Sequence, residues 1–227
     1  MSKRDVTRLV MLRTAERLFA ERGVDNVSLR ELAAAAGQRN HSAALYHFGD
    51  KRALLEALLE RHSGPADASF EPAIARLRAE GREDLEQLVR VLVAPMVAKL
   101  EDEDGGAHYL RICAELVSSQ TFPITGLRAG NGPGAQALTQ RLVAHMGDPS
   151  PALLPVRMMR TAAVLFCSLA ACLRLRAAGL FISREEFTED LVHALVASLS
   201  PRKPARATAR AKAAAGGAAA PARARKR

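Results

Sequence analysis

Three glycines, Gly23, Gly37 and Gly49, divide the first 62 residues into four short segments. Glycine adopts the left-handed conformation that closes a helix more readily than other residues, so each segment is expected to be one helix. Apolar side chains recur every three to four positions in the first and last segments. The sequence therefore predicts four helices, at residues 6–22, 29–36, 42–46 and 51–62.

Two local signals characterise the middle of this region. Ser28 and Glu31 have the spacing of a capping box, in which each side chain accepts a hydrogen bond from the backbone of the other at the start of a helix. Gly37 then separates two very short helices. Short helices joined by a glycine turn form a helix-turn-helix, so residues 1–62 are expected to be a bundle of three or four helices that contains this motif.

The remaining chain also favours helices. They are expected at 70–80, 83–100, 107–120, 134–146, 152–178 and 184–199, with a joint at 63–68, a solvated acidic loop at 101–106 and a loop rich in glycine and proline at 121–134. The chain has no Trp, two Tyr and seven Phe, so Ala, Leu and Val must fill its interior, which suits helices better than sheets. We expect an all-α protein with a larger C-terminal helical domain at 63–200.

Positive charge is concentrated at the C-terminal end. The chain has 33 Lys and Arg against 24 Asp and Glu, and residues 201–227 contain nine of the basic residues and none of the acidic ones. This segment has no bulky apolar side chain to bury and is expected to be a disordered basic tail. Such a tail can attract phosphates without sequence preference, or it can serve only to keep the chain soluble.

Several function classes have no support in the sequence. It contains no GxSxG, phosphate-binding GxxxxGK[ST] or HExxH motif, and Cys113, Cys167 and Cys172 form no CxxC pair. The longest uncharged apolar stretch, 161–173, has 13 residues, fewer than the roughly 20 that a membrane-spanning helix needs. We therefore expect a cytoplasmic protein that is not an enzyme, with no cofactor, no metal site and no contact with a membrane.

A resemblance to a known family covers residues 6–62. The run AERLFAERGVDNVSLRELAAAAG, followed by ALYHFGDKRALLEALL, resembles the DNA-binding region of TetR-type transcriptional regulators. It implies a sequence-specific homodimeric repressor of double-stranded DNA with a palindromic operator. It also implies that the C-terminal helices bind a small-molecule effector and that the last two form the subunit interface. The alternative is a nucleoid-type architectural DNA-binding protein dominated by its basic tail.

The resemblance also implies site residues. Ser28, Tyr46, His47 and Lys51 lie at or near the family's phosphate-contacting positions. One residue more than in the usual pattern lies between Gly37 and Phe48, within 38–42. Arginine can bind guanine and asparagine can bind adenine in the major groove, but Asn40 can equally cap a helix and Arg39 can contact a phosphate. For base reading we expect the residues at the entry of the recognition helix, which are Arg39, Asn40, His41 and Ser42.

Candidate effector-pocket residues lie on the helices of the C-terminal domain. They are Met96, Tyr109, Cys113, Leu116, Phe122, Met158 and Phe166. Such side chains can also be ordinary core residues. The small number of aromatic residues favours an aliphatic or weakly aromatic effector.

Overall fold

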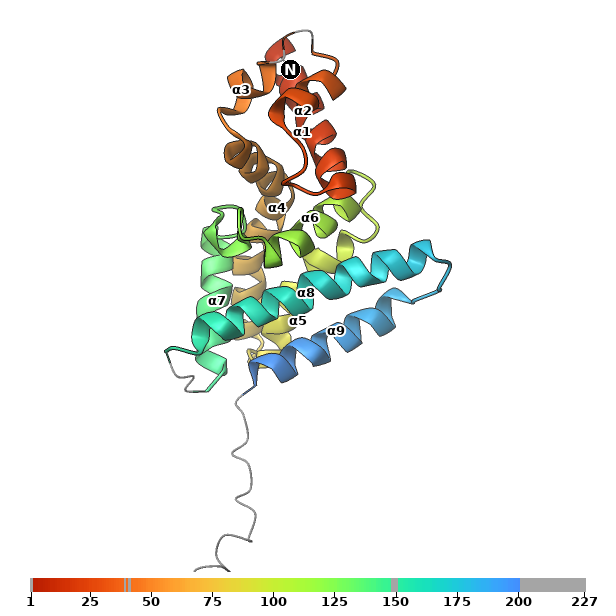
Figure 1. Ribbon diagram of the computed structural model, residues 1–227. Helices are drawn as coiled ribbons and strands as arrows, with labels where there is room; N and C mark the ends of the chain where they lie inside the picture. Colours follow the sequence, from red (N-terminus) through yellow and green to blue (C-terminus); the bar gives the residue numbers. More distant parts are fainter. Residues whose placement is uncertain (1, 39, 41, 148–150, 201–227) are drawn as a thin grey trace, which may run out of the picture.

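A computed structural model describes residues 2–38, 40, 42–147 and 151–200, which form nine α-helices, one short 3-10 helix and no strand. The expected all-α class is therefore confirmed. Arg39, His41 and the basic tail lie outside the described residues. The helices, labelled in Figure 1, are α1 (Lys3–Arg22), α2 (Leu29–Ala35), α3 (Ala43–Phe48), α4 (Lys51–Ala79), α5 (Leu85–Ala98), α6 (Gly106–Ser118), η1 (Ile124–Gly126), α7 (Pro133–His145), α8 (Leu154–Ala177) and α9 (Arg184–Leu199).

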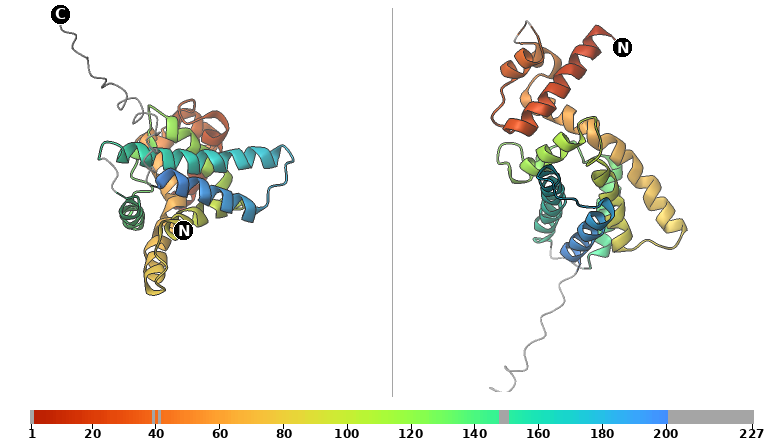
Figure 2. Two further views of the ribbon diagram at one scale, coloured as in Figure 1. Left: turned by 90° about the horizontal axis from the view of Figure 1, so that it is seen from below. Right: turned by 90° about the vertical axis from the view of Figure 1, so that its right-hand side faces the viewer.

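The molecule has two parts, a head and a body. The head consists of α1, α2, α3 and the first turns of α4, and the body contains the rest of α4 with α5 to α9. The right-hand view of Figure 2 shows α4 leaving the head and continuing along the body. One cluster of buried apolar side chains extends through both parts, from Met11 in α1 to Leu199 in α9. Because close-packed side chains transmit strain, a displacement within the body can reach the head through this cluster.

The expected joint at 63–68 is wrong, because α4 continues through it as one helix and merges the helices expected at 51–62 and 70–80. Proline inside a helix costs about 3 kcal/mol, and both Pro65 and Pro72 lie within α4. The helix continues because its buried face does not stop at the breakers, and burial of this stripe offsets the cost. Buried side chains recur at every fourth position, at Leu54, Leu58, His62, Ala66, Phe70 and Ile74.

The acidic loop at 101–106 is exposed to solvent at Glu101 and Asp104, as expected, and these two carboxylates also form ion pairs with neighbouring helices. Asp104 forms an ion pair with Arg13 of α1 at 2.9 Å and a second with Arg61 of α4. Glu101 pairs with Arg184 at the start of α9, also at 2.9 Å. The carboxylates of the loop therefore link it to α1 in the head and to α4 and the start of α9 in the body.

The last two helices lie side by side and run in opposite directions (Figure 1). The inner face of α8 packs against α6, whereas α9 packs against α5 and α8. Among the described residues, α8 is the one helix long and apolar enough to cross a membrane by length and composition, and core helices of soluble proteins meet the same test. Only 28% of its most apolar stretch is buried within the chain, so α8 has an open apolar face.

Candidate DNA-binding site and its link to the cavity

The helix-turn-helix is built from α2 and α3. Ser28 caps α2 by accepting a hydrogen bond from the Glu31 backbone N–H at 3.2 Å, and Glu31 accepts one from the Ser28 N–H at 2.9 Å. Leu32 and Ala33 are buried, which holds α2 against the core of the head. Gly37 ends the helix with a φ of +70°, a value that favours glycine. The expected capping box and glycine turn are both confirmed.

Two of the four expected base-reading residues, Arg39 and His41, lie outside the described residues. The other two, Asn40 and Ser42, are exposed before α3. Asn40 Oδ1 accepts a hydrogen bond from the Ser42 backbone N–H at 2.9 Å, so this side chain shapes the entry to α3. The side-chain NH₂ of Asn40 has no hydrogen-bond partner among the described contacts, and it is one of the two groups, with Oδ1, through which asparagine binds adenine.

Tyr46 and His47 lie on α3 in different surroundings. The Tyr46 side chain is 71% exposed, with the Arg4 guanidinium 5.5 Å from its ring centroid. The His47 ring meets the Tyr46 ring edge-on at 5.2 Å, and His47 Nδ1 is buried without a hydrogen-bond partner among the described residues. Tyr46 and Arg4 thus bring a hydroxyl donor and a positive charge to one exposed surface, as phosphate contacts require.

Lys51 lies in the first turn of α4 and faces the head. Its Nζ donates to the carbonyl oxygen of Asp25 at 3.2 Å and lies 5.9 Å from the Phe122 ring centroid. Burial lowers the pKa of Lys51 below its ordinary value. In this conformation Lys51 joins the start of α4 to the turn between α1 and α2.

A buried polar cluster joins the head to the body. Glu16 of α1 is only 2% exposed, and its Oε1 lies 2.8 Å from Nε2 of the equally buried His62 on α4. Arg61 Nη1 donates to Glu16 Oε2 at 2.7 Å. A Cβ on Gly105 would lie 1.8 Å from Glu16 Oε1, so only glycine lets this loop approach the carboxylate. Glu16 is therefore enclosed by α4 and by the loop before α6.

A second link between head and body lies on α6. Glu115 Oε1 accepts a hydrogen bond from the Val24 backbone N–H at 2.8 Å, which fixes the chain between α1 and α2. Burial raises the pKa of Glu115, although this hydrogen bond acts in the opposite direction. Two carboxylates thus attach the head to the body: Glu16 of α1 contacts α4, and Glu115 of α6 contacts the chain between α1 and α2.

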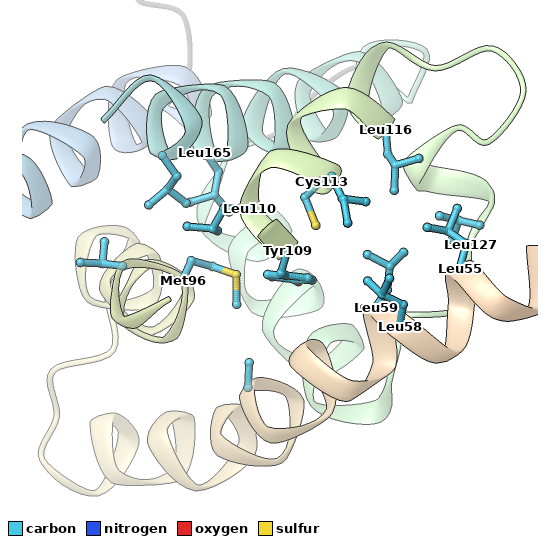
Figure 3. Packing of buried hydrophobic residues seen from close by; sticks show 14 of the residues in the cluster. Leu55, Leu58, Leu59, Met96, Tyr109, Leu110, Cys113, Leu116, Leu127 and Leu165 are labelled. Carbon is cyan, nitrogen blue, oxygen red and sulfur yellow. The ribbon is translucent and has the colours of Figure 1, made fainter. Parts of the chain in front are cut away.

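The body contains a cavity of about 270 Å³ beside this junction. Figure 3 shows Met96, Tyr109, Cys113 and Leu59 converging on it from α5, α6 and α4. The Tyr109 ring also stacks on His62, with centroids 4.9 Å apart and planes at 25°. Tyr109 therefore touches both the cavity and the cluster that holds Glu16.

The structure brings most of the expected pocket residues to this cavity. Met96, Tyr109, Cys113, Met158 and Phe166 line it. Leu116 and Phe122 do not: Leu116 is fully buried in the core, and Phe122 lies beside Lys51. Burial raises the pKa of Cys113 to about 12, so its thiol stays protonated and lines the cavity as an apolar group.

Residues 11–58 match the family described as bacterial regulatory proteins, tetR family. The N-terminal module is that of a TetR-family regulator. This match confirms the resemblance over most of the span in which the sequence indicated it, and it supports a role as a DNA-binding regulator of transcription. The TetR-family match includes Glu16 and the start of α4, but it ends before His62 and the cavity.

Several solved structures are similar to this chain. A mutant of the protein HlyIIR is 16% identical, with a TM-score of 0.50, over 89% of this chain and 100% of its own. Proteins assigned to the TetR family from Rhodococcus sp. and Mesorhizobium loti are 22% and 19% identical, with TM-scores of 0.46 and 0.47, over 88% of this chain and 100% and 98% of theirs. The likeness to HlyIIR shows a shared fold. No curated protein matches this chain.

The hydrogen bonds that cap α2 in the TetR-family module should make the stability of the protein depend on pH. Hydrogen bonds from the Ser28 backbone, the Ser28 side chain and Arg22 lower the pKa of Glu31 from 4.5 to about 2. Because the folded value lies below the unfolded one, the stabilisation by this carboxylate is present above pH 4.5 and is lost as the pH falls through 2. An NMR titration of the Glu31 carboxyl carbon should give this low pKa, and Ser28→Ala should raise it. An unchanged pKa in Ser28→Ala would contradict the capping arrangement.

Proposed function

We propose that this chain is a homodimeric repressor that binds a palindromic operator and leaves it when a small molecule occupies the cavity. The observation that supports this most directly is α4, one helix that begins in the TetR-family module and lines the cavity with Leu59, Ser63 and Asp67. A ligand that prefers a different position of α4 would shift the population away from the DNA-bound arrangement. A preference of a few kcal/mol is sufficient.

The proposed functions are assigned to the two expected domains, except that α4 belongs to both. Residues 1–62 bind DNA in the cytoplasm, and 63–200 bind the effector and the second subunit. The proposed phosphate contacts are Ser28, Tyr46, His47 and Lys51, and the proposed base contacts are Arg39, Asn40, His41 and Ser42. The exposure of Tyr46, Asn40 and Ser42 supports their assignment.

Selection of bound duplexes from a random library tests DNA recognition. The full-length protein should recover a palindrome whose half-sites lie about 34–36 Å apart or a multiple of this distance, because a twofold dimer presents two recognition helices. Arg39→Ala and Asn40→Ala should change the recovered bases, and the recovered site should reduce transcription when it overlaps a promoter. An asymmetric motif, or recovery of random duplexes, would contradict the proposal.

The open face of α8 supports a second copy as the partner. Small side chains, Ala163, Cys167 and Ala171, occupy its middle, where two helices could approach closely. Exposed apolar side chains lie at both ends: Leu153 and Val156 near the start, and Leu180 and Phe181 after the end. A twofold axis near Cys167 would place each apolar end on the opposite end of the partner, as an isologous interface requires.

The charges of α8 and α9 fit the same arrangement. Glu186 and Asp190 are exposed on the first half of α9, which lies beside the last half of the antiparallel α8. Arg157 and Arg160 lie in the first half of α8, and Arg157 Nη1 is buried without a hydrogen-bond partner among the described residues. The twofold axis would bring these acidic and basic ends together across the interface of a four-helix bundle.

Crosslinking through Cys167 tests whether the twofold axis lies near this residue. It is exposed, whereas Cys113 and Cys172 are buried. Oxidation with copper phenanthroline should therefore link two full-length chains through a direct Cys167–Cys167 disulfide near the twofold axis. Cys172→Ser should crosslink as efficiently as the wild type, and Cys167→Ser should not. A dimer in sedimentation experiments that gives no crosslink through Cys167 would place the axis elsewhere.

The basic tail should influence how strongly DNA affinity depends on salt concentration. Deletion of 201–227 removes nine basic side chains, so the decrease of DNA affinity with salt should become shallower, since that slope follows the number of neutralised phosphates. Preference for the selected operator over a random duplex should remain, because the tail reads no bases. Fluorescence anisotropy across a salt series measures both. An unchanged slope would exclude a role of the tail in binding, and loss of the preference would favour an architectural protein.

A further inference from the structure

The polar side chains of the cavity differ in how far their hydrogen bonds are satisfied. The Asp67 carboxylate accepts from the backbone N–H groups of Gly134 and Ala135, at 3.3 and 2.7 Å. Thr161 Oγ1 donates to the Arg157 carbonyl at 2.9 Å. Ser63 is the exception: its residue is only 7% exposed, and its Oγ has no hydrogen-bond partner among the described residues. A buried hydroxyl without a partner is costly, so a ligand atom that satisfies Ser63 would bind favourably.

The charge of the cavity restricts the ligand further. Among the residues that the structure describes, none of those lining the cavity is Lys, Arg or His, and the one ionisable carboxylate is Asp67. A carboxylate or phosphate ligand would lose its water there without gaining a positive partner. Asp67 already holds the first turn of α7, and a Cβ on Gly134 would lie 2.0 Å from the Asp67 carbonyl oxygen, so this contact is tightly packed. The cavity therefore disfavours anions and gives a cation little access to Asp67.

The rest of the lining is mostly aliphatic or weakly polar, and its aromatic members are Phe70, Tyr109 and Phe166. Leu59, Leu92, Met96, Leu138 and Leu165 surround the space that Ser63 faces. The volume of about 270 Å³ lies just under the lower end of the usual range for ligand sites, roughly 300–1,000 Å³. This combination fits a small molecule with an apolar chain and a single polar group.

We propose that the cavity binds a neutral, mostly aliphatic molecule whose one hydroxyl or carbonyl group forms a hydrogen bond with Ser63 Oγ. This inference rests on the proposed function, in which the occupant of the cavity is the effector. It adds the chemical class of that effector and the residue that selects it. Ser63 directly follows His62 in α4, so a ligand held by Ser63 acts on the same turn of the helix that contacts Glu16 of the head.

Three probes of equal chain length and different charge test the class: 1-octanol, octanoate and octylammonium at neutral pH. Their affinities for the full-length protein can be measured by isothermal titration calorimetry. We expect 1-octanol to bind at least ten times more tightly than octanoate, because the cavity offers an anion no positive partner. Equal or tighter binding of octanoate would overturn the inference. Tighter binding of octylammonium would assign the polar contact to Asp67 and overturn it as well.

The role of Ser63 is tested by Ser63→Ala, with Ser69→Ala as the matched control on an exposed part of the same helix. Loss of one hydrogen bond should weaken 1-octanol binding about five-fold in Ser63→Ala and leave it unchanged in Ser69→Ala. Circular dichroism and the melting temperature without probe establish that both variants are folded. Equal octanol affinity in Ser63→Ala and wild type would overturn the assignment of Ser63.

Binding to the selected duplex, measured separately, distinguishes this inference from the proposed function. A protein that binds its operator but not 1-octanol would retain the regulatory function and contradict the ligand class. A protein that binds 1-octanol through Ser63 but stays on its operator would support the ligand class and contradict release by the occupant of the cavity.

Discussion

Glu16→Ala is expected to lower the free energy of unfolding by about 3 kcal/mol, since it removes one partner from a buried charged cluster. Arg61 and His62 would both lose their contact with α1, and the side chain of Arg61 is only 18% exposed. The remaining ion pair between Arg61 and Asp104 keeps the cost near the lower end of the range for broken buried pairs. Urea unfolding followed by far-UV circular dichroism, at one fixed protein concentration, measures the change.

The matched control is Glu21→Ala on the same helix. Glu21 pairs with Arg17 at 3.1 Å, but both side chains are about half exposed, so the loss should not exceed about 0.5 kcal/mol. Glu16→Ala should also weaken operator binding, because α1 loses a contact that positions the head on α4. Equal stability of the two variants would show that the cluster does not hold the head to the body.

Ala163→Glu is expected to convert the dimer into a monomer and to lower operator affinity by at least about 100-fold. The substitution places a carboxylate in the middle of the open face of α8, where the proposed interface excludes water and offers it no partner. Two linked heads bind far more tightly than one, by factors of about 10²–10⁴, and a monomer loses this gain. Sedimentation velocity measures the oligomeric state, and fluorescence anisotropy measures binding to the duplex.

Ala68→Glu makes the same substitution at an exposed position of α4, away from α8, and serves as the control. It should remain dimeric and keep the operator affinity of the wild type. A monomeric Ala163→Glu that still binds a palindromic duplex at wild-type affinity would contradict the requirement for two subunits.

Local signals predicted the ends of helices well, because their physical cause lies within a few residues. The capping box expected at Ser28 precedes α2, where the Ser28 and Glu31 side chains each accept a hydrogen bond from the backbone N–H of the other residue. The prediction of a joint at 63–68 was wrong because the helix there is stabilised by contacts that are distant in the sequence. Gly64 and Pro65 act locally as breakers, but the buried stripe of α4 depends on contacts with distant helices. Its spacing of four was visible in the sequence and gave the better indication.

The coupling between head and body was missed for a related reason. Glu16 lies four residues after Leu12 and three before Phe19, which places a carboxylate on the buried face of α1. A charged residue on such a face requires a partner, and this was a usable signal. The partners themselves, His62 and Arg61, are 45 or more positions away and no local pattern identifies them. The cavity likewise depends on how five α-helices and η1 meet, so the sequence indicated candidate residues without separating Leu116 and Phe122 from the rest.

The continuity of α4 has a mechanical consequence for recognition. A helix of 29 residues is about 44 Å long, so a tilt of roughly 5° about one end moves the other end by about 4 Å. This displacement is close to the 3.4 Å rise between base pairs along one strand. A change in the body too small to alter any helix would therefore shift each head by about one step of the DNA ladder, and in a twofold pair the two shifts would take both heads out of phase with their half-sites.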